Sequence, residues 1–526
     1  MAPPPGRAVL SGRVQNVAGQ GEDQAAALDA GPVWTRVLPP LVMLAMALWR
    51  ITGPSYWRDE AATLTATARP FGELLRMMGH VDAVHGVYYM IIWVVVRLGG
   101  TGELVTRLPS AVAMACAAAA VAALGRRLVS PRAGIMAGLL FALLPQISLY
   151  AQDAREYALV TALATTGSYL LVRALTTAGR RTGWLAGYAV CLGVMGSLNV
   201  FSLLLVGAHA VTVALAWRRG RAGRGGQRGL PRAGHIGGSV AVGWLAASAG
   251  AFLLASPVLT LGIAQRGTLS WLTAPPLPGA IEGLGRLIGP APMLVALGLA
   301  VGLGIFMSGP AGRPLRAGWP PELLALCIPW LLLPPAVLIG VSYASPVYTF
   351  RYILFCAPAA ALLAGAGLAA LNWRPGGVAA SVPATVALAV VAALGVPAQL
   401  AARSPDGHGT NIREANAIVA AARRPGDAVL YFGTDSKYFP AAYPSGFARL
   451  DDIAQARTPS QAGNLVGKLL PASVVRQRLA RVRRVWLVKF GRYPHELLLA
   501  GLHFRLVRHW RVSGIWLVLC ARGKAG

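Results

Sequence analysis

Long apolar runs separated by short polar segments make up most of residues 34–400. A helix needs about 20 mostly apolar residues to cross a bilayer. Eleven runs come close to that length: 34–51, 108–126, 133–150, 157–175, 184–200, 201–217, 238–257, 291–308, 321–341, 352–371 and 378–400. The pattern predicts a polytopic α-helical membrane protein with about eleven transmembrane helices.

One further apolar run, residues 87–97, is too short to cross a bilayer. Its Tyr88, Tyr89 and Trp93 are the kind of side chains that anchor a helix at the membrane surface. We therefore expect this segment to lie along the interface, within a long outer loop at 52–107.

The charges between the runs predict an orientation. We expect residues 1–33 to form a flexible cytosolic tail, and five loops on that same side carry fifteen arginines and no acidic residue. Those loops are 126–132, 173–183, 218–237, 309–320 and 372–377. Because arginine-rich short loops stay in the cytosol, nearly all acidic residues of the membrane region are predicted to lie outside.

Residues 401–526 differ from the rest, with more charged and turn residues and shorter apolar runs. Because the N-terminus is expected in the cytosol, an odd number of spans puts this segment on the outer side of the membrane. The sequence favours a helix at 411–424 and strands at 428–432, 484–490 and 515–520. We expect a small extracytoplasmic α/β domain.

The composition agrees with a membrane protein rather than a soluble enzyme: 55% of the 526 residues are hydrophobic and 13% are charged. The net charge of +29 could indicate nucleic acid, but the short loops explain much of it as an orientation signal. We expect no nucleic-acid partner. The five cysteines have no spacing typical of a metal site or a disulfide framework.

Charged residues gather in two predicted outer loops. Arg58, Asp59 and Glu60 follow the first apolar run, and Asp153, Arg155 and Glu156 stand between two later runs. Solvated loop acids, or for Glu156 an ion pair at a helix end, are the simplest explanations. Charges beside lipid are costly, however, and are often functional. A carboxylate could accept a proton from a hydroxyl, while arginines bind the phosphate of a lipid-linked sugar.

The order of short motifs resembles a known family. Its elements are Arg58-Asp59-Glu60, Asp82-x-x-His85-x-x-Tyr88-Tyr89, Arg107-Leu-Pro-Ser110, Gly125-Arg-Arg-Leu128 and Gln152-Asp-Ala-Arg-x-Tyr157. Together they resemble GT-C glycosyltransferases, above all the bacterial family 39 relatives of protein O-mannosyltransferases and lipid A aminoarabinose transferases. The resemblance is clearest over residues 50–180.

The resemblance implies an inverting hexosyltransferase of the bacterial cytoplasmic membrane. Such an enzyme moves a monosaccharide, with mannose suggested by the family alone, from a polyprenyl-phosphate donor to a hydroxyl on a protein, lipid or glycan. The reaction takes place on the outer face of the membrane, where the donor is reached from the bilayer. The resemblance names neither the sugar nor the acceptor.

The resemblance also implies roles for individual residues. Asp59 is the expected catalytic base, and Glu60 supports it or orients the acceptor. Asp153, Arg155 and Arg351 are expected to bind the donor and its phosphate. The family often has His-Pro-Pro where this chain has His85-Gly86-Val87, so a role for His85 does not carry over directly.

Further polar and aromatic residues are candidates for contacts with the acceptor or substrate: His80, Asp82, His85, Gln265 and Trp271. The histidines and Asp82 could instead bind a divalent metal together with Asp59, although their spacing does not require one. Structural roles and ordinary interfacial packing are the alternatives. No cofactor is certain, and a divalent metal stays open.

Two other functional classes are compatible with a polytopic protein. A transporter or a flippase for a lipid-linked sugar would also need many spans, but its proton or ion relay should place charges inside them. Charges are nearly absent from the interiors of the predicted spans and gather at one surface instead. An outer-face scaffold that binds a sugar donor without turnover is the third possibility.

Overall fold

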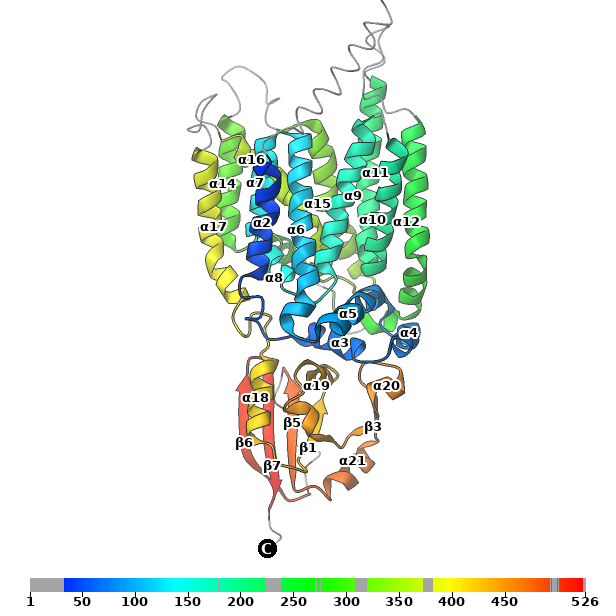
Figure 1. Ribbon diagram of the computed structural model, residues 1–526, viewed down its shortest axis with the longest axis vertical. Coiled ribbons are helices and arrows are strands. Elements are labelled where there is room, and N and C mark those ends of the chain that lie inside the picture. Colours follow the sequence, from blue (N-terminus) through cyan, green and yellow to red (C-terminus); the bar gives the residue numbers. More distant parts are fainter. Residues whose placement is uncertain are drawn as a thin grey trace, which may run out of the picture.

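The computed structural model describes residues 33–177, 180–222, 238–269, 272–274, 276–307, 319–371, 382–491, 493, 499 and 501–523. A bundle of long helices carries a domain with a β-sheet at one end (Figure 1). The predicted fold class, a helical membrane protein with a C-terminal α/β domain, is confirmed.

Seven helices of the described chain are long and apolar enough to cross a membrane, and the number rises to nine if each of two bent pairs is one span. The single helices are α6 (Glu103–Leu128), α9 (Tyr157–Thr176), α11 (Leu204–Ala222) after η2 (Val200–Leu203), α12 (Gly238–Ala264), α15 (Pro321–Ser342), α16 (Ala357–Ala369) after η4 (Phe350–Cys356), and α17 (Val382–Ala402). The bent pairs are α7 (Pro131–Leu143) with α8 (Pro145–Ala151), and α13 (Leu277–Arg286) with α14 (Ala291–Met307). Their bends are 65° and 69°.

The other two predicted spans correspond to shorter or less apolar helices. Helix α2 (Trp34–Leu48) has 15 residues and α10 (Arg181–Leu198) has 18. Helix α2 packs against α6 and α7, and α10 packs against α9 and α12 (Figure 1). All eleven predicted runs thus fall on helices, but the count of eleven membrane crossings stays a prediction.

The first predicted outer loop folds into short helices across one end of the bundle (Figure 1). They are α3 (Arg58–Thr67), α4 (Phe71–His80), η1 (Ala83–His85) and α5 (Gly86–Gly99). Helix α5 is apolar but only 14 residues long, and the indole nitrogen of Trp93 donates to the Arg69 carbonyl at 2.9 Å. Its position at the end of the bundle agrees with the expected interfacial segment.

The C-terminal domain contains a five-stranded sheet in the order β2-β1-β5-β7-β6. Its strands are β1 (Ala428–Phe432), β2 (Asp451–Asp452), β5 (Arg484–Phe490), β6 (Phe504–Val512) and β7 (Ile515–Arg522), and β3 (Gln455–Arg457) pairs with β4 (Lys468–Leu469) in a second sheet. Its helices are α18 (Ile412–Ala422), η6 (Asp435–Tyr438), α19 (Phe439–Ala442), η7 (Phe447–Arg449), α20 (Pro459–Ala462) and α21 (Ala472–Leu479). The predicted helix and three strands are confirmed. Strand β6, most of whose residues are exposed, was not predicted.

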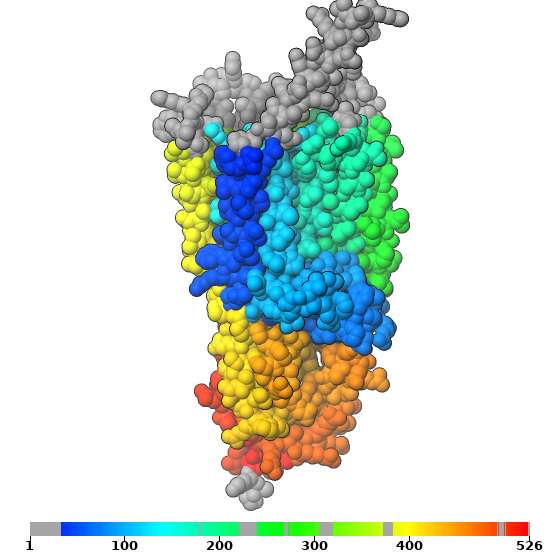
Figure 2. Space-filling model, in the orientation of Figure 1, coloured from blue at the N-terminus to red at the C-terminus, as the bar shows by residue number. Residues whose placement is uncertain are grey.

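Polar contacts fix the C-terminal domain against the first loop, and the two surfaces meet directly in Figure 2. Arg413 and the Tyr443 hydroxyl both donate to Glu103 Oε1 at 2.6 Å. Farther along the same interface, Arg69 Nη2 donates to the Asn464 carbonyl at 3.1 Å. The domain therefore has a defined orientation over this end of the bundle.

Candidate active site

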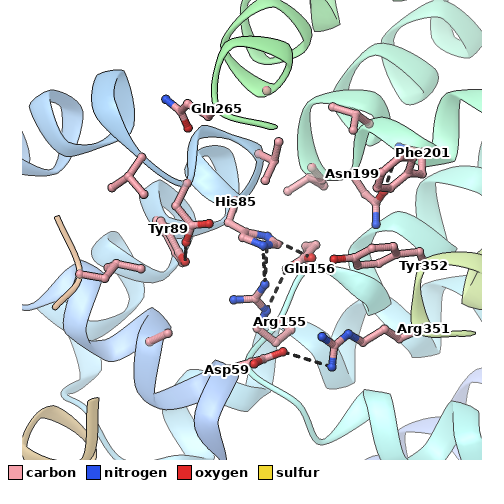
Figure 3. A pocket seen from close by; sticks show the side chains of 18 of the residues that line it. Asp59, His85, Tyr89, Arg155, Glu156, Asn199, Phe201, Gln265, Arg351 and Tyr352 are labelled. Atoms are coloured by element: carbon pink, nitrogen blue, oxygen red, sulfur yellow. Dashed lines mark hydrogen bonds and ion pairs between the residues drawn. The ribbon is translucent and has the colours of Figure 1, made fainter. Parts of the chain in front are cut away.

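A cavity of about 860 Å³ lies where the first loop, the membrane helices and the C-terminal domain meet. Its polar lining comes from distant parts of the chain and includes Arg58, Asp59, Asp82, His85, Tyr89, Arg155, Glu156, Asn199, Gln265, Arg266, Arg351, Tyr352, Asp435, Tyr438 and Asn464. Apolar side chains on the membrane side, including Leu198, Val200, Leu259 and Ile263, complete the wall. Figure 3 shows Asp59, Arg155 and Arg351 facing one another across it.

Asp59 sits in the first turn of α3, where the N-terminal end of a helix favours a carboxylate. Arg58 Nε lies 3.0 Å from Asp59 Oδ1, and Arg351 Nη1 lies 3.3 Å from Oδ2. Burial by itself raises the pKa of Asp59, but the charges of Arg351, Arg155 and Arg58 lower it overall. The predicted base is therefore ionised at neutral pH and lies at the cavity surface.

Glu60 is fully buried and does not line the cavity. Arg107 donates to both of its oxygens, from Nε at 2.8 Å and from Nη2 at 2.7 Å. The backbone N–H groups of Ala154 and Trp57 also donate to it, at 2.9 and 3.3 Å. Burial alone raises the pKa of Glu60, but Arg107 lowers it overall. The contacts join α3, α6 and the loop at 152–156, so they hold the first turn of α3, which carries Asp59.

The buried Arg155 and Glu156 form a group with the partly buried His85 beside Asp59 (Figure 3). Arg155 Nη2 lies 2.9 Å from a ring nitrogen of His85. The Glu156 carboxylate lies 3.2 Å from Arg155 Nε and 3.3 Å from His85 Nδ1. Burial raises the pKa of Glu156, but Arg155 and His85 lower it to about 2. The expected ion pair of Glu156 thus exists, and it holds Arg155 at the cavity.

Asp153 differs from the prediction that it lines the donor pocket. It is fully buried, is not among the lining residues, and accepts a hydrogen bond from the Trp57 indole at 2.9 Å through Oδ1. Burial and the neighbouring Glu60 carboxylate raise its pKa well above the usual value. Of this motif, Arg155, Glu156 and Tyr157 line the cavity, whereas the Asp153 carboxyl group is buried against Trp57.

The remaining expected residues fall into two groups. Asp82, which accepts a hydrogen bond from the Tyr89 hydroxyl, and Gln265 both line the cavity. Gln265 Oε1 accepts from the Ala83 N–H at 2.9 Å and joins the end of α12 to the first loop. His80 does not line the cavity, and its Nδ1 lies 2.8 Å from the Arg76 carbonyl. Trp271 lies outside the described residues.

A metal site is not evident in the described part of the chain. No group of three or more His, Cys, Asp or Glu side chains there is arranged to hold an ion. The neighbours of Asp59 are guanidinium groups, which suit an anion rather than a second cation. The positive charge that faces the cavity is supplied by arginine.

Several lining residues were not predicted. Asp435, Tyr438 and Asn464 belong to the C-terminal domain, and Asn199 lies directly before η2. None belongs to a sequence motif that distinguishes it from other polar residues. Only the docking of the domain onto the first loop brings its side chains to the cavity.

Comparison with known proteins agrees with the fold. Residues 86–224, less than half of the chain, match the family described as dolichyl-phosphate-mannose-protein mannosyltransferase. ArnT from Cupriavidus metallidurans, in a crystal structure bound to undecaprenyl phosphate, superimposes with a TM-score of 0.59 at 14% sequence identity. That match covers 93% of this chain and 97% of ArnT. No curated protein matches the chain significantly.

Two other solved structures are more distant. The oligosaccharyltransferase AglB from Archaeoglobus fulgidus has a TM-score of 0.48 at 11% identity, with 87% of this chain and 69% of AglB covered. The mycobacterial arabinofuranosyltransferase AftD has a TM-score of 0.49 at 16% identity, with 93% and 40% covered. The chain has the GT-C glycosyltransferase fold, and the resemblance stated from the motifs is confirmed.

Proposed function

We propose that this chain is an inverting glycosyltransferase that uses a polyprenyl-phosphate-linked monosaccharide and a hydroxyl acceptor. The observation that carries the proposal is the pairing of a carboxylate, Asp59, with Arg155 and Arg351 in a cavity whose other wall is apolar. Such a cavity suits a donor with a phosphate head and a hydrocarbon tail. The undecaprenyl phosphate bound to ArnT, which has the same fold, supports that donor class.

The roles of the side chains follow from their charges. Asp59 removes the proton from the acceptor hydroxyl as its oxygen bonds to the anomeric carbon of the donor sugar. The bond from that carbon to the phosphate oxygen breaks, and polyprenyl phosphate leaves with the bonding electrons. Arg155 and Arg351 stabilise the negative charge that grows on the phosphate. Attack opposite the leaving group inverts the anomeric centre.

Donor binding also adjusts the base. Without donor, burial raises the pKa of Asp59, but the arginines lower it by more. The carboxylate is therefore a weak base. A bound phosphate neutralises Arg155 and Arg351 and raises the pKa of Asp59. The base is therefore strongest when the donor is in place.

The surrounding residues keep this arrangement. Glu60 and Arg107 fix the first turn of α3, and Glu156 and His85 hold Arg155. Asp82 and Gln265 lie where an acceptor or the donor sugar would make contact. The C-terminal domain lines the cavity opposite the membrane helices, and this part of the wall would face the acceptor.

The location is part of the proposal. The arginine-rich loops favour a cytosolic N-terminal tail and an outer reaction centre in a bacterial cytoplasmic membrane. The description of the matched family, a dolichyl-phosphate-mannose-protein mannosyltransferase, supports mannose and a protein acceptor. Residues 34–400 would form the membrane domain, and residues 401–526 the extracytoplasmic one.

Transfer assays test the proposal. Purified protein in liposomes is given a polyprenyl-phosphate hexose labelled in the sugar, together with a peptide or glycan acceptor. Labelled acceptor of inverted configuration, with release of polyprenyl phosphate, is the expected result. Movement of the intact donor across the bilayer with no transfer to any acceptor would favour the flippase instead.

A further inference from the structure

Arg58 is shared between the predicted base and a carboxylate of the C-terminal domain. Its Nε lies 3.0 Å from Asp59 Oδ1, and its Nη1 lies 3.5 Å from Asp435 Oδ2. We propose that Asp435 is a positioning residue that acts through Arg58 on Asp59, so that the C-terminal domain helps set the strength of the base. This inference rests on the proposed function.

The position of Asp435 is fixed by its own domain. It begins η6, three residues after the end of strand β1, and Thr434, Asp435 and Tyr438 of this segment line the cavity. The Phe490 N–H at the end of β5 donates to the next side chain, Ser436 Oγ, at 3.1 Å, and Lys437 forms an ion pair with Asp452. A short helix held on both sides cannot easily move its carboxylate away from Arg58.

The docking contacts fix the domain as a whole. Glu103, on the membrane helix α6, accepts from both Arg413 and Tyr443 of the C-terminal domain. Arg69, at the end of α3, donates to the carbonyl of Asn464. The contact between Arg58 and Asp435 belongs to the same interface, so it is maintained by these contacts as well as by the pair itself.

The charges around Asp59 show what Asp435 can change. The groups that interact electrostatically with Asp59 come from every neighbouring element: Arg58, Tyr150, Asp153, Arg155, Arg351, Tyr352, His408 and Tyr438. Three of them are arginines that hold the Asp59 proton affinity down. Asp435 engages one end of Arg58 and so weakens one of the three. Neutralising Asp435 removes a negative charge that competes with Asp59 for Arg58, which lowers the pKa of Asp59 and weakens the base.

The size of this effect is limited by water. The side chains of Arg58 and Asp435 are 24% and 32% exposed, so their attraction is partly screened. We expect Asp435→Asn to lower kcat by about two- to threefold, in keeping with the small energy of a partly exposed pair. The direction of the pH shift is more informative than the size of the loss.

The test compares kcat/KM against pH for the wild type, Asp435→Asn and Arg58→Gln. Asp435→Asn should move the acidic limb to lower pH and leave the donor KM unchanged. Arg58→Gln removes a positive charge from Asp59 and should move the limb to higher pH. Asp435→Glu should restore the wild-type profile, and Asp451→Asn, an exposed carboxylate on β2, serves as the matched control. A merely structural role of Asp435 would lower activity without opposite shifts.

A second readout does not depend on turnover. Carbodiimide labelling of Asp59, followed by mass spectrometry across a pH series, reports when the carboxyl is protonated. Opposite shifts of the labelling curve in Asp435→Asn and Arg58→Gln would support the inference even if no sugar transfer is found, whereas absence of transfer alone would count only against the proposed function. Unchanged curves in both, or shifts in the same direction, would overturn it. Asp435→Ser replaces Asp435→Asn if that variant unfolds.

Discussion

Arg351 Nη1 lies 3.3 Å from Asp59 Oδ2. This contact joins η4, directly before helix α16, to the first turn of α3. Both side chains are largely buried yet line the same cavity. A buried carboxylate next to a guanidinium is ionised, and an incoming phosphate competes with it for the same arginine. This contact therefore couples the donor site to the base and gives the first two predictions.

Asp59→Asn should abolish most of the transfer activity. An amide has nearly the same shape but cannot accept the acceptor proton, and loss of a general base costs about 10²- to 10⁴-fold. Labelled polyprenyl-phosphate hexose and acceptor measure the loss, while thermal unfolding in detergent confirms that the variant folds. The matched control is Glu282→Gln, an exposed carboxylate that does not line the cavity, which should keep full activity. Near-wild-type turnover in folded Asp59→Asn would remove Asp59 from the role of base.

Arg351→Gln should weaken donor use and shift the pH profile. The change removes a cation from the leaving phosphate, which should lower kcat/KM for the donor by about 10- to 100-fold, as expected when a charged hydrogen bond is lost. It also removes the positive charge that contributes most to lowering the pKa of Asp59. The pKa of Asp59 rises, so the acidic limb of the activity profile should move to higher pH.

Steady-state kinetics across a pH series check both parts of the Arg351 prediction. Arg505→Gln, an exposed arginine on the edge strand β6, controls for loss of net charge. A variant with unchanged donor kinetics would leave Arg351 with only a structural role. A profile that moved to lower pH would contradict its electrostatic effect on Asp59.

The architecture was predictable because lipid imposes a strong rule on sequence. Each apolar run, including those around α2 and α10, corresponds to a helix, and the run at 87–97 forms the short helix α5. The strands 428–432 and 484–490 were predicted at their observed bounds because they are short apolar runs between turn residues. Strand β6 was missed because its exposed, arginine-rich sequence contains no such apolar run.

The site was predictable only in part. Motif order brought Asp59, Arg155 and Arg351 forward, and all three line one cavity. The sequence could not show that Arg155 lines the cavity while Asp153 does not. The fold of the loop that carries both decides this, because it places the Asp153 carboxyl group against the Trp57 indole. The contribution of Asp435 depends on how a separate domain docks, and no local pattern encodes that contact.

Asp153→Asn should preserve activity and stabilise the protein at neutral pH. Burial and Glu60 raise the pKa of Asp153 in the folded state, so the folded protein binds this proton more tightly than the unfolded chain does. For such a group, stability is fully present below the unfolded pKa of about 3.9 and falls as pH rises toward the folded value. Asparagine keeps an oxygen for the Trp57 indole and cannot ionise.

Thermal unfolding at two pH values tests the Asp153 prediction. The variant should match the wild type near pH 4 and unfold at a higher temperature than the wild type at pH 8. Transfer activity should stay within about threefold of wild type, because small changes away from reacting groups have small effects. A folded variant that has lost donor binding would return Asp153 to the donor pocket predicted from the motif.

Glu60→Gln should strongly destabilise the fold. Glu60 and Arg107 are both fully buried and joined by two hydrogen bonds, and removing one partner of a buried ion pair costs about 3–5 kcal/mol because the other charge stays unpaired. The double variant Glu60→Gln/Arg107→Met should lose less than the sum of the two single changes. Arg286→Gln breaks the exposed pair with Glu282 and should cost at most about 1 kcal/mol. Chemical denaturation in detergent compares them; equal losses for the buried and the exposed pair would show that the Glu60–Arg107 contact does not hold the first loop in place.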